Sequence, residues 1–316
     1  MPLLGMQTRA SRVWMAAILP LLLLAARGGA QAPEQEPFSI AVDVNLVTLQ
    51  ASVHDRQSRD VGNLRQQDFA LYEDSVRQTI RMFRREDAPV TVGLVVDHSG
   101  SMLEKLGDVM LAASTFALSS NPMDEMFVVN FNEKVFFGLS GANQFTDNPV
   151  ELKDAIGRAP ATGQTALYDA IAAALEKMQA GRWDKKVLVV ISDGGDNASK
   201  HTLADITTLA ERSNAVIYTI GIFSDNDPDA NPGVLRRLAE MSGGESFFPK
   251  QLTELTPISE HIAHDIRNQY MLGYVSTNLK QDGTHRAIRL VAEVPGSTGK
   301  LRVRTRKGYV ARGGAK

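Results

Sequence analysis

The stretch that decides the fold runs from residue 90 to residue 102 and reads Val-Thr-Val-Gly-Leu-Val-Val-Asp-His-Ser-Gly-Ser-Met. Its apolar run, Val92–Val96, is typical of a strand that is covered on both faces. A second continuous apolar run lies at Val187–Ile191. Two strands of this kind predict a mostly parallel sheet with helices on either side.

The sequence around this stretch alternates between strand and helix patterns from residue 90 to residue 268. Apolar residues recur at three- and four-residue steps in four segments, which predicts amphipathic helices; these segments are Leu103–Ala117, Leu167–Met178, Leu203–Ala210 and Leu235–Ala239. The strand candidates are Val90–Asp97, Met126–Asn132, Val135–Leu139, Val187–Asp193, Ala215–Ile222 and Ser246–Phe248. Asn132-Glu133 joins two of them as a hairpin, so one edge strand should be antiparallel. We therefore expect an α/β fold with a doubly wound, mostly parallel six-stranded sheet and helices on both faces.

Two flanking segments, 38–89 and 269–312, have the period-2 pattern of short antiparallel strands. Neither flank has enough strands to be stable alone. We expect the two to pair with each other and to form a small composite β domain, into which the α/β domain at 90–268 is inserted.

The N-terminus has the features of a secretory signal. Arg9 and Arg12 precede an apolar run, Val13–Ala26, and small residues follow up to Ala32. The run is about 14 residues long, whereas a membrane-spanning helix needs about 20. We predict a cleaved signal peptide at 1–32, a polar linker at 33–37, and a secreted or periplasmic protein without a membrane span after cleavage. An uncleaved membrane anchor is the alternative.

The composition excludes several classes of protein. The chain has 316 residues, with 34 Lys and Arg against 36 Asp and Glu, and a formal net charge of -2. This balance gives no support to a nucleic-acid partner, which usually requires a basic excess. Cysteine is absent, which excludes disulfides, thiolate metal sites and a cysteine nucleophile.

Five oxygen-bearing residues stand where strands end or helices begin. Asp97, Ser99 and Ser101 follow the first parallel strand, Thr165 opens a helix, and Asp193 ends another core strand. Ligands of open α/β sheets bind at the carboxyl ends of strands. Carboxylates and hydroxyls are the hard donors that Mg²⁺ prefers. Each residue alone could equally be a helix cap, but the full set predicts a cation site with one coordination position left open.

This set resembles the metal ion-dependent adhesion site of the von Willebrand factor type A domain, and the resemblance covers Val90–Arg267. It implies that Ser99, Ser101 and Thr165 contact the metal and that Asp97 and Asp193 act directly or through water. The flanks resemble a secreted bacterial branch of this family. The matching segments are Gln67-Asp68-Phe69-Ala70-Leu71-Tyr72-Glu73-Asp74, Tyr270-Met271-Leu272-Gly273-Tyr274 and Arg306-Lys307-Gly308-Tyr309.

The expected function is metal-dependent binding, of the adhesion type, to a protein that presents an acidic side chain. Mg²⁺ is the expected cation, with Mn²⁺ or Ca²⁺ as alternatives, and His98, Gly100 and Gln164 are expected to contact the partner. We expect no catalytic residue. One alternative is a scaffold subunit of an envelope assembly; another is a metal-assisted hydrolase with His98 as its base. His261 and His264 lie three residues apart on a predicted helix, but the sequence places no third ligand beside them, which favours a solvated helix face.

Overall fold

A computed structural model describes residues 46–85, 87–140, 144–223, 228–293 and 301–311. The predicted signal peptide, the linker and residues 38–45 of the N-terminal β segment lie outside the described residues. Within them, no helix is both long enough and apolar enough to cross a membrane.

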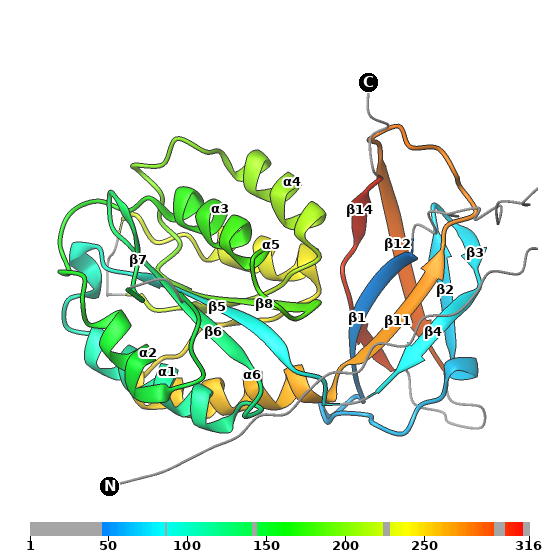
Figure 1. The fold of residues 1–316 in the computed structure, drawn as a ribbon, viewed down its shortest axis with the longest axis horizontal. Coiled ribbons are helices and arrows are strands. Elements are labelled where there is room, and N and C mark those ends of the chain that lie inside the picture. Colours follow the sequence, from blue (N-terminus) through cyan, green and yellow to red (C-terminus); the bar gives the residue numbers. More distant parts are fainter. Residues whose placement is uncertain (1–45, 86, 141–143, 224–227, 294–300, 312–316) are drawn as a thin grey trace, which may run out of the picture. The chain divides into compact units, whose positions relative to one another are not determined.

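A six-stranded sheet forms the centre of the α/β domain, in the order β10-β9-β8-β5-β6-β7 (Figure 1). Its strands are β5 (Val90–Asp97), β6 (Glu125–Phe131), β7 (Val135–Phe137), β8 (Lys185–Ser192), β9 (Val216–Gly221) and β10 (Ser246–Phe247). Every neighbouring pair is parallel except β6 and β7, which are antiparallel. The predicted α/β sheet and its antiparallel edge strand are confirmed.

Helices cover both faces of this sheet (Figure 1). One face packs against α1 (Leu106–Ser119), α2 (Pro149–Ile156) and α6 (Leu255–Asn268), and the other against α3 (Leu167–Met178), α4 (Leu203–Ser213) and α5 (Pro232–Ser242). Strand β5 contributes side chains to the apolar cores on both faces of the sheet. Leu94 and Val96 pack in the core with α1, α2 and α6, and Val95 packs in the core with α3, α4 and α5. The described residues also contain three short 3-10 helices: η1 (Gln66–Asp68), η2 (Gly100–Met102) and η3 (Leu252–Glu254). Helix α2 was not predicted; the Asn148 side chain, which accepts from the Val150 N–H, and a proline at the first turn start it.

The flanks form two four-stranded sheets, β13-β1-β11-β4 and β14-β12-β2-β3. Their strands are β1 (Leu46–His54), β2 (Phe69–Glu73), β3 (Val76–Gln78), β4 (Ile80–Arg84), β11 (Tyr270–Val275), β12 (His285–Ala292), β13 (Arg302–Arg304) and β14 (Gly308–Val310). Each sheet takes strands from both flanks, and one apolar cluster joins the two sheets. The composite β domain expected from the strand count is therefore present. The pattern of Gln78–Phe83 taken alone predicts one short strand, and this prediction is wrong, because the chain leaves one sheet at Gln78 and joins the other at Ile80.

The side chain of Glu73 joins these two sheets. Its buried carboxylate accepts hydrogen bonds from the hydroxyls of Tyr274 (2.6 Å), Ser276 (2.5 Å) and Tyr309 (3.0 Å). Burial and the neighbouring carboxylate raise the pKa values of both tyrosines, which keeps them protonated as donors. Glu73, Tyr274 and Tyr309 come from the three flank segments that the sequence analysis singled out.

The flank strands and the α/β domain belong to one compact unit, Val44–Lys316. The side chain of Arg306 links these two parts. Its guanidinium donates to the Thr48 carbonyl at 2.7 Å and to the Asn214 side chain, and it lies over the Tyr309 ring. Burial lowers the pKa of Arg306 to about 10. The buried guanidinium thus connects β1 with the end of α4.

Candidate functional site

Asp97, the last residue of β5, has a carboxylate that hydrogen bonds hold in one orientation. Asp97 is fully buried, and each of its carboxylate oxygens accepts a hydrogen bond. The Ser99 N–H donates to Oδ1 at 2.8 Å, and the Ser192 hydroxyl, at the end of β8, donates to Oδ2 at 2.6 Å. These two bonds fix the orientation of Asp97 at the carboxyl ends of two adjacent strands.

Two hydroxyls connect this loop to the second predicted carboxylate. Ser99 Oγ lies 3.1 Å from Ser101 Oγ, and the Ser101 hydroxyl donates to Asp193 Oδ2 at 2.8 Å. Asp193 Oδ1 accepts the Gly195 N–H at 3.0 Å. The structure thus joins Asp97, Ser99, Ser101 and Asp193 in one set of contacts, although 92 residues separate the last two.

The segment that contains Thr165 lies against the same loop through its backbone. The Thr162 N–H donates to the His98 carbonyl at 2.8 Å, and the Gly100 N–H to the Gly163 carbonyl at 3.4 Å. Thr165 is buried, and its own N–H donates to the Asn197 side chain. The fifth predicted residue therefore stands in the loop that packs on the other four predicted residues.

Gly163 shows why this second loop needs glycine. Its φ is +85°, a conformation that disfavours side chains, and the Glu133 carboxylate lies where a Cβ would be placed. A residue with a side chain here would displace either Glu133 or the loop that carries Thr165.

The electrostatics of the site suit a hard cation. Burial raises the pKa of Asp97 to about 6, the neighbouring charge of Asp193 acts in the same direction, and the bonds from Ser192 and Ser99 oppose the shift. Two carboxylates held close together away from water are costly unless a positive charge compensates them. The donors are all carboxylate and hydroxyl oxygens, and their chemistry fits a divalent cation such as Mg²⁺.

The three predicted partner contacts fall into two groups. Gly100 and Gln164 are exposed beside the site. His98 has no exposed surface, and its Nε2 lies 3.2 Å from Asn130 Oδ1. Burial lowers the pKa of this imidazole. The expectation that His98 touches a partner does not fit this burial, and neither does the role of general base that the hydrolase alternative required.

Sequence reasoning missed the residues that position the site. Ser192 holds Asp97, and the Asn231 N–H donates to the Asp193 carbonyl at 2.9 Å. The Asn197 side chain accepts the Thr165 N–H and also donates to Asp229. The position of Ser192 at the end of an apolar strand was its only sequence signal.

A hollow of about 470 Å³ adjoins the site at Ser101. Its wall includes Lys105, whose Nζ donates to the Ile222 carbonyl, and the exposed Lys250. The hollow therefore combines the buried amino group of Lys105 and the exposed one of Lys250 with the carboxylate of Glu104, beside the carboxylate and hydroxyl oxygens of the loop.

Comparison with known proteins gives a family. The family profile described as the von Willebrand factor type A domain matches residues 91–261, more than half of the chain. The comparison with curated proteins returned no match.

The solved structures that match this chain include three from bacteria. BatB from Bacteroides thetaiotaomicron is 16% identical and has a TM-score of 0.45, with 56% of this chain and 98% of that one covered. A von Willebrand factor type A protein from Catenulispora acidiphila is 15% identical, with 77% and 73% covered and a TM-score of 0.48. The vWF domain of the pilus tip protein Mfa5 from Porphyromonas gingivalis is 14% identical, with 57% and 95% covered and a TM-score of 0.46. None of these likenesses identifies a function for this chain.

Proposed function

Because the chain belongs to the von Willebrand factor type A domain family, we propose that it is a protein-interaction module of the adhesion type that binds an acidic partner through a divalent cation. The observation that carries the proposal is the unbroken set of contacts from Asp97 through Ser99 and Ser101 to Asp193. Mg²⁺ suits these oxygens best, and Mn²⁺ or Ca²⁺ could replace it.

Five residues would hold the cation: Asp97, Ser99, Ser101, Thr165 and Asp193. When bound, the ion supplies a positive charge and an open position for an anionic group. The remaining work is done by the chain itself. Ser192 and the Ser99 N–H keep Asp97 oriented, and the Gly195 N–H does the same for Asp193. Such preorganisation lowers the cost of ordering the site when the partner arrives.

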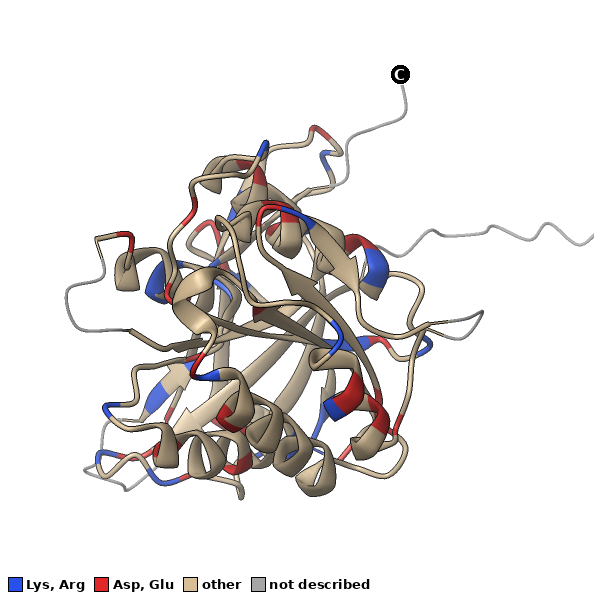
Figure 2. Ribbon diagram, turned by 90° about the vertical axis from the view of Figure 1, so that its left-hand side faces the viewer, with Lys and Arg blue, Asp and Glu red and all other residues tan. Residues whose placement is uncertain are grey.

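The surface beside the site favours an acidic protein group. The hollow at Ser101 is lined by two lysines, Lys105 and Lys250, and by one carboxylate, Glu104, and the excess of positive charge would attract a carboxylate toward the cation. Figure 2 views the side on which β5 and β8 end, and acidic and basic residues are interspersed there. This mixture supports a protein partner over a nucleic acid, whose binders usually carry a basic stripe.

The proposed location is outside the cytoplasm, in the periplasm or beyond. It rests on the basic start, the short apolar run and the small residues of 1–32. N-terminal sequencing of the protein from cell fractions tests it. A mature chain that begins near Gln31 or Pro33 supports export with cleavage, and an intact Met1 chain in membranes supports the anchor instead.

Cation binding is the first experiment. Calorimetry with Mg²⁺ and Mn²⁺ compares the wild-type protein with Asp97→Asn and Ser101→Ala. We expect the affinity to fall at least about tenfold in both variants, as loss of a ligand usually costs no less than loss of an outer contact. Asp154→Asn, an exposed carboxylate on α2, is the matched control and should bind as wild type.

Partner chemistry is the second experiment. A peptide array in which each acidic peptide is paired with its Asn or Gln form is probed with the protein in Mg²⁺ and in chelator. Retention by acidic members alone, lost in chelator and in Asp97→Asn, supports the proposal. Cation binding with no preference for acidic peptides would instead favour the scaffold role, and binding that survives in chelator would refute a metal bridge.

A further inference from the structure

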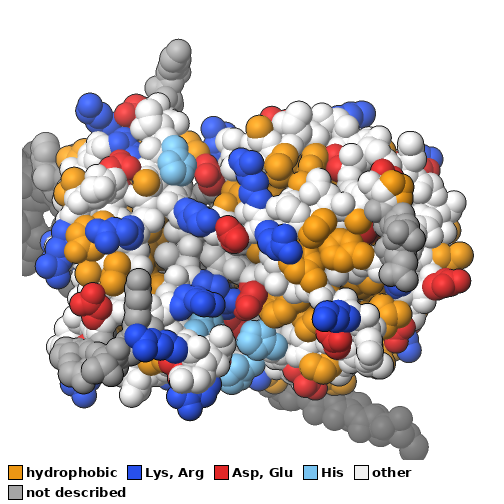
Figure 3. Space-filling model, turned by 180° about the vertical axis from the view of Figure 1, so that it is seen from behind, with side chains coloured by type: hydrophobic (Ala, Val, Ile, Leu, Met, Phe, Trp, Pro, Cys, Tyr) orange, Lys and Arg blue, Asp and Glu red, His pale blue; other side chains and the backbone are white. Residues whose placement is uncertain are grey.

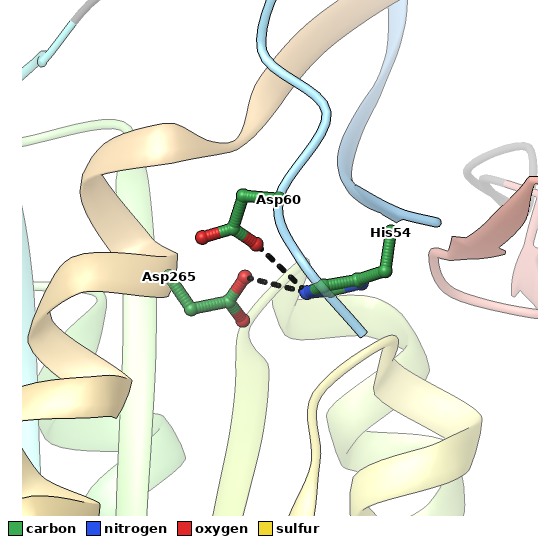
Figure 4. A group of neighbouring side chains, drawn as sticks. All are labelled: His54, Asp60 and Asp265. Carbon is green, nitrogen blue, oxygen red and sulfur yellow. Dashed lines mark ion pairs between the residues drawn. The ribbon is translucent and has the colours of Figure 1, made fainter. Parts of the chain in front are cut away.

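A second group of metal-ligating side chains lies where the flank strands meet the last helix of the α/β domain (Figure 4). We name it the junction cluster: His54 at the end of β1, Asp60 in the following loop, and His264 and Asp265 on α6. These residues do not belong to the site at Asp97. On the face in Figure 3, histidine side chains gather beside acidic and basic groups.

The ligand atoms of three of these residues are close enough to share one ion. His54 Nε2 lies 2.9 Å from Asp60 Oδ1 and 4.0 Å from Asp265 Oδ1, and all three atoms lie within 4.8 Å of one another. Ligands around a tetrahedral Zn²⁺, at about 2.0–2.2 Å from the metal, stand about 3.3 Å apart. The two distances from His54 lie on either side of that spacing, and the carboxylate oxygens of Asp60 and Asp265 lie within 4.8 Å of each other, so side-chain shifts would be needed to bring all three atoms around one ion.

A fourth ligand stands next to the group. His264 Nε2 lies 2.9 Å from Asp60 Oδ2, and its side chain is 62% exposed. Asn268 Nδ2 lies 3.2 Å from the same nitrogen, so the exposed ring would leave that contact when it turns toward an ion. His261, one turn earlier, faces Glu245 instead, at 3.6 Å.

Two contacts on one oxygen hold the carboxylate of Asp265 in place. Its Oδ2 accepts the Tyr218 hydroxyl at 2.5 Å and Arg304 Nη2 at 2.6 Å, while Oδ1 is the oxygen that faces His54. Ligating carboxylates are commonly oriented by hydrogen bonds of this kind. Asp265 is also 2% exposed, so these contacts hold it firmly.

The charges of these neighbours leave room for a cation. Arg304 is shared between Asp265 and Glu245, and Asp60 forms ion pairs with the imidazoles of His54 and His264. When the imidazoles are neutral, the carboxylates of Asp60, Asp265 and Glu245 face Arg304, and the charge of Lys185 also acts on Asp265, so three negative charges stand against two positive ones. A divalent ion would offset the excess of negative charge.

From this geometry we propose that the junction cluster binds Zn²⁺ through His54, Asp60 and Asp265, with His264 as the fourth ligand. Zn²⁺ takes imidazole nitrogen together with carboxylate oxygen, whereas Mg²⁺ prefers oxygen alone. The ion ties the loop after β1 to α6. The junction cluster is thus a structural metal site, separate from the cation site proposed at the carboxyl end of the sheet.

The test measures Zn²⁺ binding by calorimetry in protein that already carries Asp97→Asn, so that the first site does not contribute. We expect one Zn²⁺ per chain and a rise in the unfolding temperature on adding it. Adding His54→Gln or Asp60→Asn should weaken binding by about 100-fold or more, since loss of outer-shell partners alone costs 10- to 100-fold. His285→Ala, an exposed histidine paired with Glu211, should change nothing.

Two readouts keep the result clear if one variant folds poorly. Circular dichroism reports folding of each variant, and Asp60→Asn alters a partly exposed carboxylate that tolerates change better than His54. Zn²⁺ binding that is absent from the Asp97→Asn protein, or unchanged by both junction variants, overturns the proposal and leaves these residues as ion pairs. Neither outcome bears on Mg²⁺ binding by the wild-type protein.

Discussion

Replacing Glu73 by alanine should destabilise the composite β domain more than any single hydroxyl loss. The carboxylate accepts three hydroxyl donors, at 2.5, 2.6 and 3.0 Å, and is 2% exposed. A hydrogen bond to a charged group contributes about 1.5–3 kcal/mol, and a buried donor left without a partner adds its own cost. The three bonds act together, so we expect a loss of about 3–5 kcal/mol rather than their full sum.

Urea unfolding, followed by circular dichroism and tryptophan fluorescence, measures this loss. With a slope in the usual range, the midpoint should fall by about 1–2 M. Tyr274→Phe should cost about 2 kcal/mol and Tyr309→Phe, with its longer bond, about 1 kcal/mol. Glu293→Ala, an exposed glutamate at the end of β12, is the control.

A double-mutant cycle tests whether Tyr274 stabilises the domain through its bond to Glu73. If Tyr274 acts through Glu73, the effects of Glu73→Ala and Tyr274→Phe should not add. Full additivity, or a loss below about 1 kcal/mol in Glu73→Ala, would show that the carboxylate does not hold the two sheets together.

Three further predictions concern the site and the core. Ser192→Ala removes the 2.6 Å bond to Asp97 and should lower Mg²⁺ affinity about tenfold in calorimetry, whereas Ser120→Ala, which only removes a bond at the end of α1, should not. Gly163→Ala, at φ +85° and against Glu133, should cost about 1–2 kcal/mol of unfolding free energy in urea. Burial lowers the pKa of Lys185 to about 8, so between about pH 8 and pH 10.5 the unfolded chain binds more protons and stability should rise with pH. Lys185→Met should lack this rise; an identical pH profile in both proteins would contradict the burial cost.

Much of the fold follows from local patterns. The apolar run Val92–Val96 predicts a doubly covered strand, and β5 indeed serves two cores. The predicted pairing of the flanks holds because strands need partners, whichever part of the chain supplies them. The error at Gln78–Phe83 has a physical cause, since a chain that passes between stacked sheets keeps its strand-like pattern across the crossing.

The two candidate sites differ in how much of each could be predicted from the sequence. Asp97, Ser99 and Ser101 stand in one loop at a strand end, so their meeting could be expected. His54 and Asp265 are separated by about 210 residues and meet only because β1 pairs with β11, the strand that follows α6. A local sequence pattern cannot predict a contact between residues so far apart. For this reason the sequence placed no further ligand beside His264 and favoured a solvated helix face for it.

The flank strands join the α/β domain at one end of its parallel sheet, which explains how the two parts of the chain can act separately. The α/β domain begins at Val90 and ends with α6 at Asn268. Val90 pairs with Lys185 at the start of β8, and Lys185 Nζ donates to the Ile266 carbonyl in the last turn of α6. The two points of insertion are therefore neighbours at the amino ends of the parallel strands. Asp97 and Asp193 lie at the opposite, carboxyl ends of β5 and β8, so the flank sheets can be fastened to the domain without covering the loops that we propose bind the cation.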